Sequence, residues 1–191
     1  MTKPKKLLIA AVCLVAILTS AVVGTIAWLT DKTTTVTNTF SPSNIGLTLT
    51  EEGFNGKMVP GTKIDKEAIV TVTNDIDCYV FVKVTESDNL KDFIVYTMAT
   101  GWELVPGQTN VYYRAVAANA AEKEFSVLAD DKVTVDSEVT KAMMATLSDN
   151  TKYPTLSFTA YAIQQEGIAD ANTDGTAVDE AWAVASAQAT P

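Results

Sequence analysis

Short segments in which apolar and polar residues alternate constrain the fold of this chain more than any other feature. In the clearest of them, Ile45, Leu47 and Leu49 alternate with glycine and threonine, a period of two residues. This period places every second side chain on one face of a β-strand, so that face can pack in a core. Similar segments follow at short spacing, separated by residues typical of turns; they are 68–74, 78–85, 93–97, 111–116, 125–128, 132–135 and 155–163.

About eight strands at this spacing predict a mostly β fold, namely an antiparallel β-sandwich of jelly-roll-like form over residues 41–191. The segment 78–85 is apolar on both faces, which predicts a central strand. Two further stretches predict small helical insertions. Apolar residues repeat every four positions in 138–147, and Thr176 with Asp179 forms a capping box before 177–187.

The composition excludes most classes of enzyme. The length of 191 residues predicts one folded domain, alone or with a targeting segment, and 47% of apolar residues is too high for a disordered protein. Histidine is absent, so no triad or metal site that needs an imidazole can form, and two cysteines are too few for a four-thiolate zinc site. Two carboxylates suffice for glycoside hydrolysis, but no pair stands out. We therefore expect no enzymatic activity and no catalytic or cofactor-binding residues.

The N-terminus predicts an export signal. Three lysines within the first six residues precede an uncharged run from Leu7 to Leu29, which is 23 residues long. Such a run is long enough to cross a bilayer as a helix, and it also fits a signal peptide with a basic start and an apolar centre. We expect an N-terminal hydrophobic signal helix, with a retained membrane anchor as the alternative.

Small residues at the end of this run favour cleavage. Thr25 and Ala27 have the size that the −3 and −1 pockets of a signal peptidase accept, so 1–27 is the predicted signal peptide. Trp28 then begins the mature chain, and the membrane is a partner of the precursor only. A cut after Ala21 is the alternative.

Charge and two isolated residues give further expectations. The 14 basic and 23 acidic residues leave a net charge of −9, which makes nucleic acid an unfavourable partner. Cys78 is the only thiol of the predicted mature chain, and its place in an apolar strand predicts a small core residue. Arg114, the only arginine, is expected to pair with an acidic residue.

One segment has half of a calcium-binding pattern. Asp170, Asn172 and Asp174 are spaced as in the first half of a calcium loop and precede a glycine. The twelfth position, which should be a bidentate glutamate, is Ala181, and Glu180 lies one residue early. The segment is therefore a weak calcium candidate, and a solvated acidic loop is the alternative.

Aromatic residues allow a second kind of ligand. A row of exposed rings can stack on sugars, whereas rings in a sandwich more often fill its core. The sequence does not separate these two roles for the candidates, which are Trp102, Tyr112, Tyr113, Tyr153 and Tyr161.

Three blocks resemble one group of exported Gram-positive proteins. The first is Gly24–Asp31, followed by Phe40 and the strand 45–49; the second is Val59–Ile64 before a strand that ends at Asn74; the third is 156–160. Together they resemble the proteins with SipW-type signal peptides, which include the TasA-like biofilm matrix fibre proteins and the camelysins. The resemblance covers about half of the chain.

The resemblance implies a secreted protein of the extracellular matrix or cell surface, cut by a dedicated signal peptidase after Ala27. It implies a jelly-roll domain and self-assembly into fibres, or co-assembly with related matrix proteins. In such fibres the segment 28–40 is donated as a strand to the next subunit, with Val36 and Phe40 in its pockets. Pairing of this segment within its own subunit, or a stalk, are the alternatives.

Two other functions remain as alternatives. One is a monomeric surface accessory or glycan-binding module. The other is a camelysin-like peptidase, which the absence of histidine disfavours because carboxylates alone suit calcium or magnesium better than zinc.

Overall fold

A computed structural model describes residues 43–51, 57–171 and 176–188. The predicted signal peptide, its cleavage residues Thr25, Ala27 and Trp28, and the donor residues Val36 and Phe40 lie outside the described residues. Residues 42–191 form one compact unit that holds every described element, so we expect it to fold without the first 41 residues.

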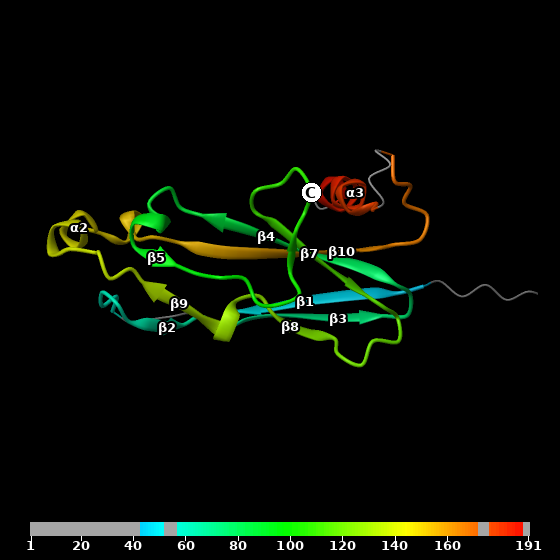
Figure 1. Cartoon of the computed structure of the whole chain (residues 1–191), viewed down its shortest axis with the longest axis horizontal. Helices are drawn as coiled ribbons and strands as arrows, with labels where there is room; N and C mark the ends of the chain where they lie inside the picture. The colour runs from blue at the N-terminus through cyan, green and yellow to red at the C-terminus, as the bar shows by residue number, and fades with distance from the viewer. Residues whose placement is uncertain (1–42, 52–56, 172–175, 189–191) are drawn as a thin grey trace, which may run out of the picture. The chain divides into compact units, whose positions relative to one another are not determined.

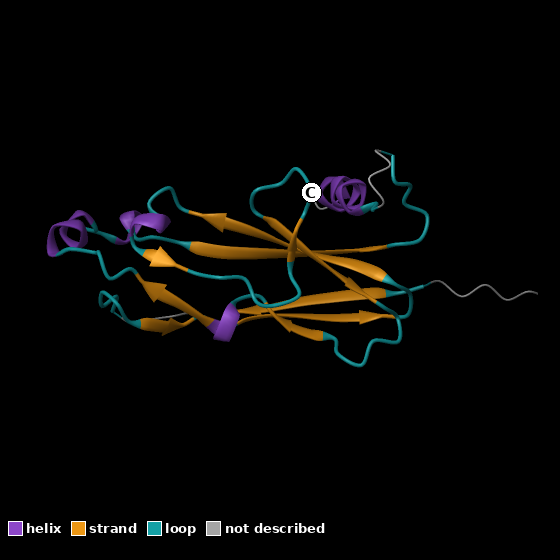
Figure 2. Cartoon of the chain, viewed as in Figure 1, coloured by secondary structure: helices purple, strands orange, loops and turns teal. Residues whose placement is uncertain are grey.

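The fold is mostly β, with three antiparallel sheets and few helices, as expected for a β-sandwich (Figure 2). The described strands are β1 (Ile45–Glu51), β2 (Lys63–Asp65), β3 (Ala68–Asn74), β4 (Cys78–Glu86), β5 (Ile94–Val95), β6 (Glu103–Leu104), β7 (Val111–Val116), β8 (Glu124–Ser126), β9 (Lys132–Val135) and β10 (Leu156–Gln164). The α-helices are α2 (Lys141–Thr146) and α3 (Val178–Gln188), and the short 3₁₀ turns are Leu90–Asp92, Ala129–Asp131 and Asn150–Lys152.

Two of the sheets form one continuous layer. Their orders are β1-β3-β8 and β2-β9-β5, and the strand line 63–74 runs antiparallel to 124–135 through both. Between the two ladders, the Lys66 N–H donates to the Asp131 carbonyl at 2.8 Å and the Val127 N–H donates to the Ala68 carbonyl at 2.8 Å. The interruption is therefore a local bend in one layer.

The third sheet, of order β10-β4-β7-β6, forms the opposite layer (Figure 1). Alternate valines of β4 (Val80, Val82 and Val84) are fully buried in the core between the layers. Phe81, on the other face, is buried beneath α3, where its ring centroid lies 5.5 Å from that of Trp182. The prediction of a central strand that is apolar on both faces is confirmed, since β4 lies between β10 and β7.

The boundaries of several elements differ from the predictions. The helix expected over 138–147 is only α2, because Thr140 caps it by accepting a hydrogen bond from the Met143 N–H at 3.2 Å. The strand expected over 93–97 is reduced to β5. Two short strands, β2 and β6, were not expected.

Within the described ranges, no helix has the length and apolar character needed to cross a membrane.

Candidate functional site

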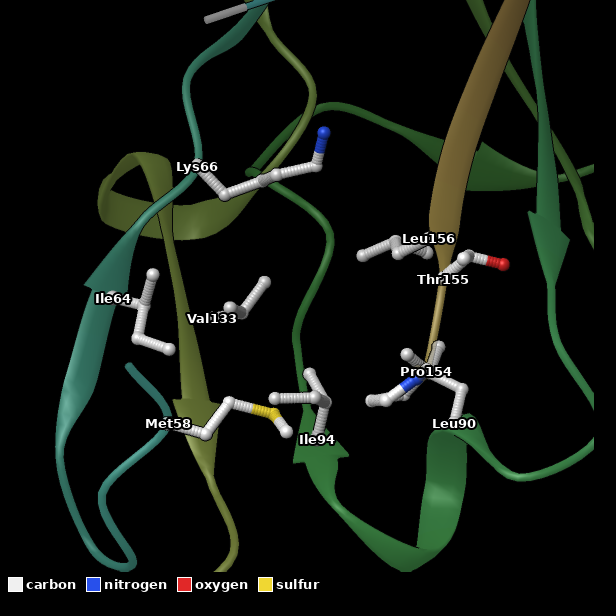
Figure 3. Close-up of a pocket in the computed structure, with 9 residues that line it drawn as sticks. All are labelled: Met58, Ile64, Lys66, Leu90, Ile94, Val133, Pro154, Thr155 and Leu156. Atoms are coloured by element: carbon white, nitrogen blue, oxygen red, sulfur yellow. The ribbon is translucent and has the colours of Figure 1, made fainter. Parts of the chain in front are cut away.

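A groove opens where β1 ends. β1 pairs with β3 from Ile45 opposite Asn74 to Glu51 opposite Ala68, so its ladder stops before β2 begins. Among the described strands, β2 has a partner on one side only, and β10 is the edge of its own sheet. Between β2 and the start of β10 lies a groove of about 270 Å³ (Figure 3). It is lined by Met58, Ile64, Lys66, Leu90, Ile94, Val133, Pro154, Thr155 and Leu156.

The two walls of the groove come from the two layers. Figure 3 shows Ile64 of β2, Val133 of β9 and Ile94 of β5 facing Leu156 of β10 and the adjacent Leu90 across the groove. Ile64 and Val133 are cross-strand partners, so the pairing of β2 with β9 places both side chains on one wall. The walls are mostly apolar, and the groove continues the line that β1 occupies.

A polar cluster closes one end of the groove. The Lys66 ammonium lies 2.9 Å from the Glu51 carboxylate and 5.5 Å from the centre of the Phe158 ring. The other carboxylate oxygen of Glu51 accepts a hydrogen bond from the Phe158 N–H at 3.3 Å. Glu51 therefore joins the edge of β1 to the edge of β10 where β1 stops.

Exposed apolar side chains flank the groove in sequence. Val59 and Tyr153 are each 51% exposed. Val59 directly follows Met58, and Tyr153 directly precedes Pro154; both Met58 and Pro154 line the groove. Large exposed apolar residues beside an apolar groove are typical of surfaces that another segment covers.

Backbone groups at both edges face the groove. In a strand, alternate residues direct their N–H and C=O to opposite edges. The Phe158 N–H points to the outer edge of β10, so Leu156 presents its backbone groups to the same edge. On the other side, the Thr62 carbonyl and the Lys66 N–H bond toward β9 and its flanking residues, which leaves Lys63 and Asp65 turned outward. An extended segment placed here therefore lies beside two strand edges, that of β2 and that of β10.

The chain enters the domain at the opposite end of β1. The Asn44 N–H donates to the Asp75 carboxylate at 2.8 Å, and Ile45 pairs with Asn74. β1 then runs seven residues to Glu51, beside the groove. At about 3.3 Å per residue, entry point and groove are separated by about 20 Å.

The weak calcium candidate is only partly described. The Ala171 N–H, next to Asp170, donates to the Glu180 carboxylate at 2.9 Å, which ties the loop to the first turn of α3. Asn172 and Asp174 lie outside the described residues. In the part of the chain that is described, no group of three or more acidic or cysteine residues is arranged to hold a metal ion. Calcium binding stays a prediction.

The five candidate aromatics do not form one platform. Trp102 is buried, and its indole N–H donates to the Ser126 carbonyl at 2.8 Å. Tyr113 and Tyr161 pack beside α3. Tyr153 lies by the groove, and Tyr112 lines a separate pocket.

Arg114 does not pair with an acid, contrary to expectation. Its guanidinium lies 5.2 Å from the ring centre of Trp102 and 4.3 Å from that of Phe125, and it donates to the carbonyls of Thr100 and Gly101. Burial lowers the pKa of Arg114, an effect that Glu122 opposes. Within the described residues no carboxylate forms an ion pair with it. Arg114 thus joins β7 to β8 across the sandwich.

The interpretation of Cys78 as a core residue is confirmed, because its side chain is fully buried. Burial raises the pKa of the thiol, Lys123 lowers it and Asp77 adds to the rise. We expect Cys78 in a protein starting at Ser41 to react with an aromatic disulfide reagent at least about 100-fold more slowly when folded than in denaturant. Rapid stoichiometric labelling of the folded protein would contradict this.

The raised pKa of Cys78 makes the stability of the folded protein depend on pH in one direction. Because the pKa of the folded thiol lies above that of the unfolded chain, its contribution to stability is complete below the unfolded value. The contribution is lost as the pH rises through the folded value.

The sequence did not single out the groove. Its lining comes from six separate parts of the chain, and the only local signals are the apolar residues of two loops, Met58–Val59 and Tyr153–Pro154.

Comparisons of this chain with protein-family models, with curated proteins and with solved structures find no match.

Proposed function

We propose that this chain is an exported structural protein, a subunit of an extracellular biofilm-matrix or surface fibre. In this proposal the segment 28–40 of one copy adds as a strand to the groove of the next copy. The observation that carries it is the apolar groove between two strand edges, with backbone groups turned to those edges, from Leu156 of β10 and from Lys63 and Asp65 of β2.

The chemistry of the segment matches that of the groove. Residues 33–40 are uncharged and rich in threonine, which favours an extended backbone. Val36 and Phe40 are an even number of residues apart, so in a strand they share one face and can fill the space lined by Ile64, Val133 and Leu156.

Chain length favours a neighbouring copy as the acceptor. Only four residues separate Phe40 from Ile45. Fully extended, this link reaches about 18 Å, whereas the groove begins about 20 Å away at the far end of β1. Phe40 therefore falls short of the groove of its own subunit.

The contact joins opposite ends of the subunit, so it is head-to-tail. Such a contact does not close on itself and generates a filament. The nested pairing of 63–74 with 124–135 and of β4 with β7 supports the jelly-roll-like form of the proposed family, although β1 bonds to β3 and lies beside β10 without joining its sheet.

Truncation tests the donor. We expect protein starting at Trp28 to form filaments in negative-stain electron microscopy and protein starting at Ser41 to stay monomeric in size-exclusion chromatography. Phe40→Asp should behave like the truncation, because it places a charge in an apolar groove, and Thr37→Ser is the matched control that should polymerise. Filaments from the protein starting at Ser41, or monomers from both proteins, would contradict the proposal.

Complementation tests the groove itself. Leu156→Arg in the protein starting at Trp28 keeps the donor and blocks the acceptor, whereas the protein starting at Ser41 keeps only the acceptor. Neither should polymerise alone, and a mixture should give a one-to-one dimer. A mixture that stays monomeric, with both proteins showing folded melting profiles, would show that the segment or the groove has another occupant or none, and would overturn this assembly.

A further inference from the structure

A second concave surface lies on a different part of the sandwich. It has a volume of about 570 Å³, within the range of small-molecule sites, and side chains of β4, β5 and β7 contribute to it. We call it the tyrosine pocket, after its two rings, Tyr96 and Tyr112. Its polar lining also includes Glu86, Lys91, Thr97 and Thr109.

The charges in the tyrosine pocket cancel. The Tyr96 hydroxyl donates to one carboxylate oxygen of Glu86, and the Lys91 ammonium lies 3.4 Å from the other. The Glu86 side chain is largely shielded, with 23% of it exposed. Its carboxylate is held in place by both partners. A site with one paired carboxylate and one paired ammonium does not select an ion.

Both phenols line the pocket, and one of them has a hydroxyl without a hydrogen-bond partner among the described residues. Burial, the hydrogen bond to Glu86, the charge of Glu86 and the nearby Tyr112 all raise the pKa of Tyr96. Tyr112 lies opposite Val82 on the inner face of β7 and is half-buried. Among the described residues no hydrogen-bond partner of its hydroxyl occurs, and Tyr112 is one of the residues that line the pocket.

We propose that the tyrosine pocket binds a neutral saccharide. Sugar rings present C–H faces that pack on aromatic rings and hydroxyls that need both donors and acceptors. Tyr96 and Tyr112 supply the ring faces, Glu86 accepts hydrogen bonds, and the Tyr112 hydroxyl is available to donate or accept. An apolar ligand that covered Tyr112 would leave its hydroxyl unpaired, which is unfavourable. The inference is independent of the proposed fibre.

The pocket is tested with neutral oligosaccharides on the protein starting at Ser41. Cellotetraose, maltotetraose and tetra-N-acetylchitotetraose are the probes, with a galacturonic acid oligomer as the charged comparison, measured by saturation-transfer NMR and calorimetry. We expect binding of at least one neutral probe. Glu86→Gln and Tyr112→Phe should each weaken it about tenfold, since Glu86→Gln replaces a charged acceptor oxygen with an amide donor and Tyr112→Phe removes a hydroxyl that bonds to the ligand.

The neighbouring tyrosine provides a matched control. Tyr113→Phe removes the same hydroxyl from the opposite face of β7, where that hydroxyl bonds to Glu103 at 2.9 Å, so it should leave sugar binding unchanged. The proposal is overturned if no neutral probe binds, if only the charged oligomer binds, or if Tyr113→Phe weakens binding as much as Tyr112→Phe. Unchanged melting temperatures in all three variants exclude a folding defect as the cause.

Discussion

Replacing Trp182 with alanine is expected to lower the free energy of unfolding by about 3–5 kcal/mol, the range for large aromatic residues removed from a core. Trp182 holds α3 on the outer face of the sheet, with its ring centre 5.5 Å from that of Phe81 and 5.1 Å from that of Tyr161, edge to face. α3 has 11 residues, a length at which an isolated helix is marginal in water. Losing its anchor therefore also exposes Phe81.

The measurement is denaturant unfolding of the protein starting at Ser41, followed by fluorescence and circular dichroism. Val184→Ala on the same helix is the control. Val184 is 41% exposed, so the expected change is within about 0.5 kcal/mol. Equal losses from the two variants, or a loss of less than about 1 kcal/mol from Trp182→Ala, would show that α3 does not depend on this contact.

Gly101→Ala is expected to lower the free energy of unfolding by about 3 kcal/mol through two separate effects. Gly101 has a φ of +90°, which side-chain-bearing residues rarely adopt. A Cβ at this position would also overlap a terminal nitrogen of Arg114, so the guanidinium must move. It would then lose its place between Trp102 and Phe125 and its bonds to two carbonyls.

A second glycine separates these two effects. Gly107 has a φ of +74°, and a Cβ there would meet no atom within 4 Å. Gly107→Ala should therefore show only the backbone strain, about 1 kcal/mol. In an Arg114→Ala background, Gly101→Ala should fall to the same value, because the obstructing side chain is gone. If Gly101→Ala and Gly107→Ala are equal with Arg114 present, the stacked arginine contributes nothing measurable.

Strands with a full period of alternation could be predicted from the sequence, and short ones could not. β1, β4 and β10 were expected because their alternation extends over several residues. β2 and β6 have three and two residues, too few to display a period. Their conformation is set by partners distant in the chain, as in the pairing of Ile64 with Val133. Helix 138–147 was predicted too long because Val139 is buried in the core ahead of the capping Thr140.

The groove could not be predicted, for a related reason. Met58, Leu90, Val133 and Leu156 meet only because of how the strands pair, and no local pattern marks them. The same holds for Arg114. The excess of acidic residues predicted an acidic partner for Arg114. Alternation along β7 instead turns its side chain to the inner face, where rings and carbonyls surround it.

The position of β10 has a consequence for the time course of folding. This strand bonds to β4, with Leu156 opposite Glu86, and its Phe158 N–H bonds to Glu51, 107 residues earlier in the chain. Pairing at such separations must overcome loop-closure entropy before it stabilises anything, and sheets of this kind fold in milliseconds to seconds. Until β10 is synthesised and free to pair, β4 lacks one of its two neighbouring strands and the core stays open on that side. We therefore expect the nascent chain to complete its core only after β10 has been synthesised.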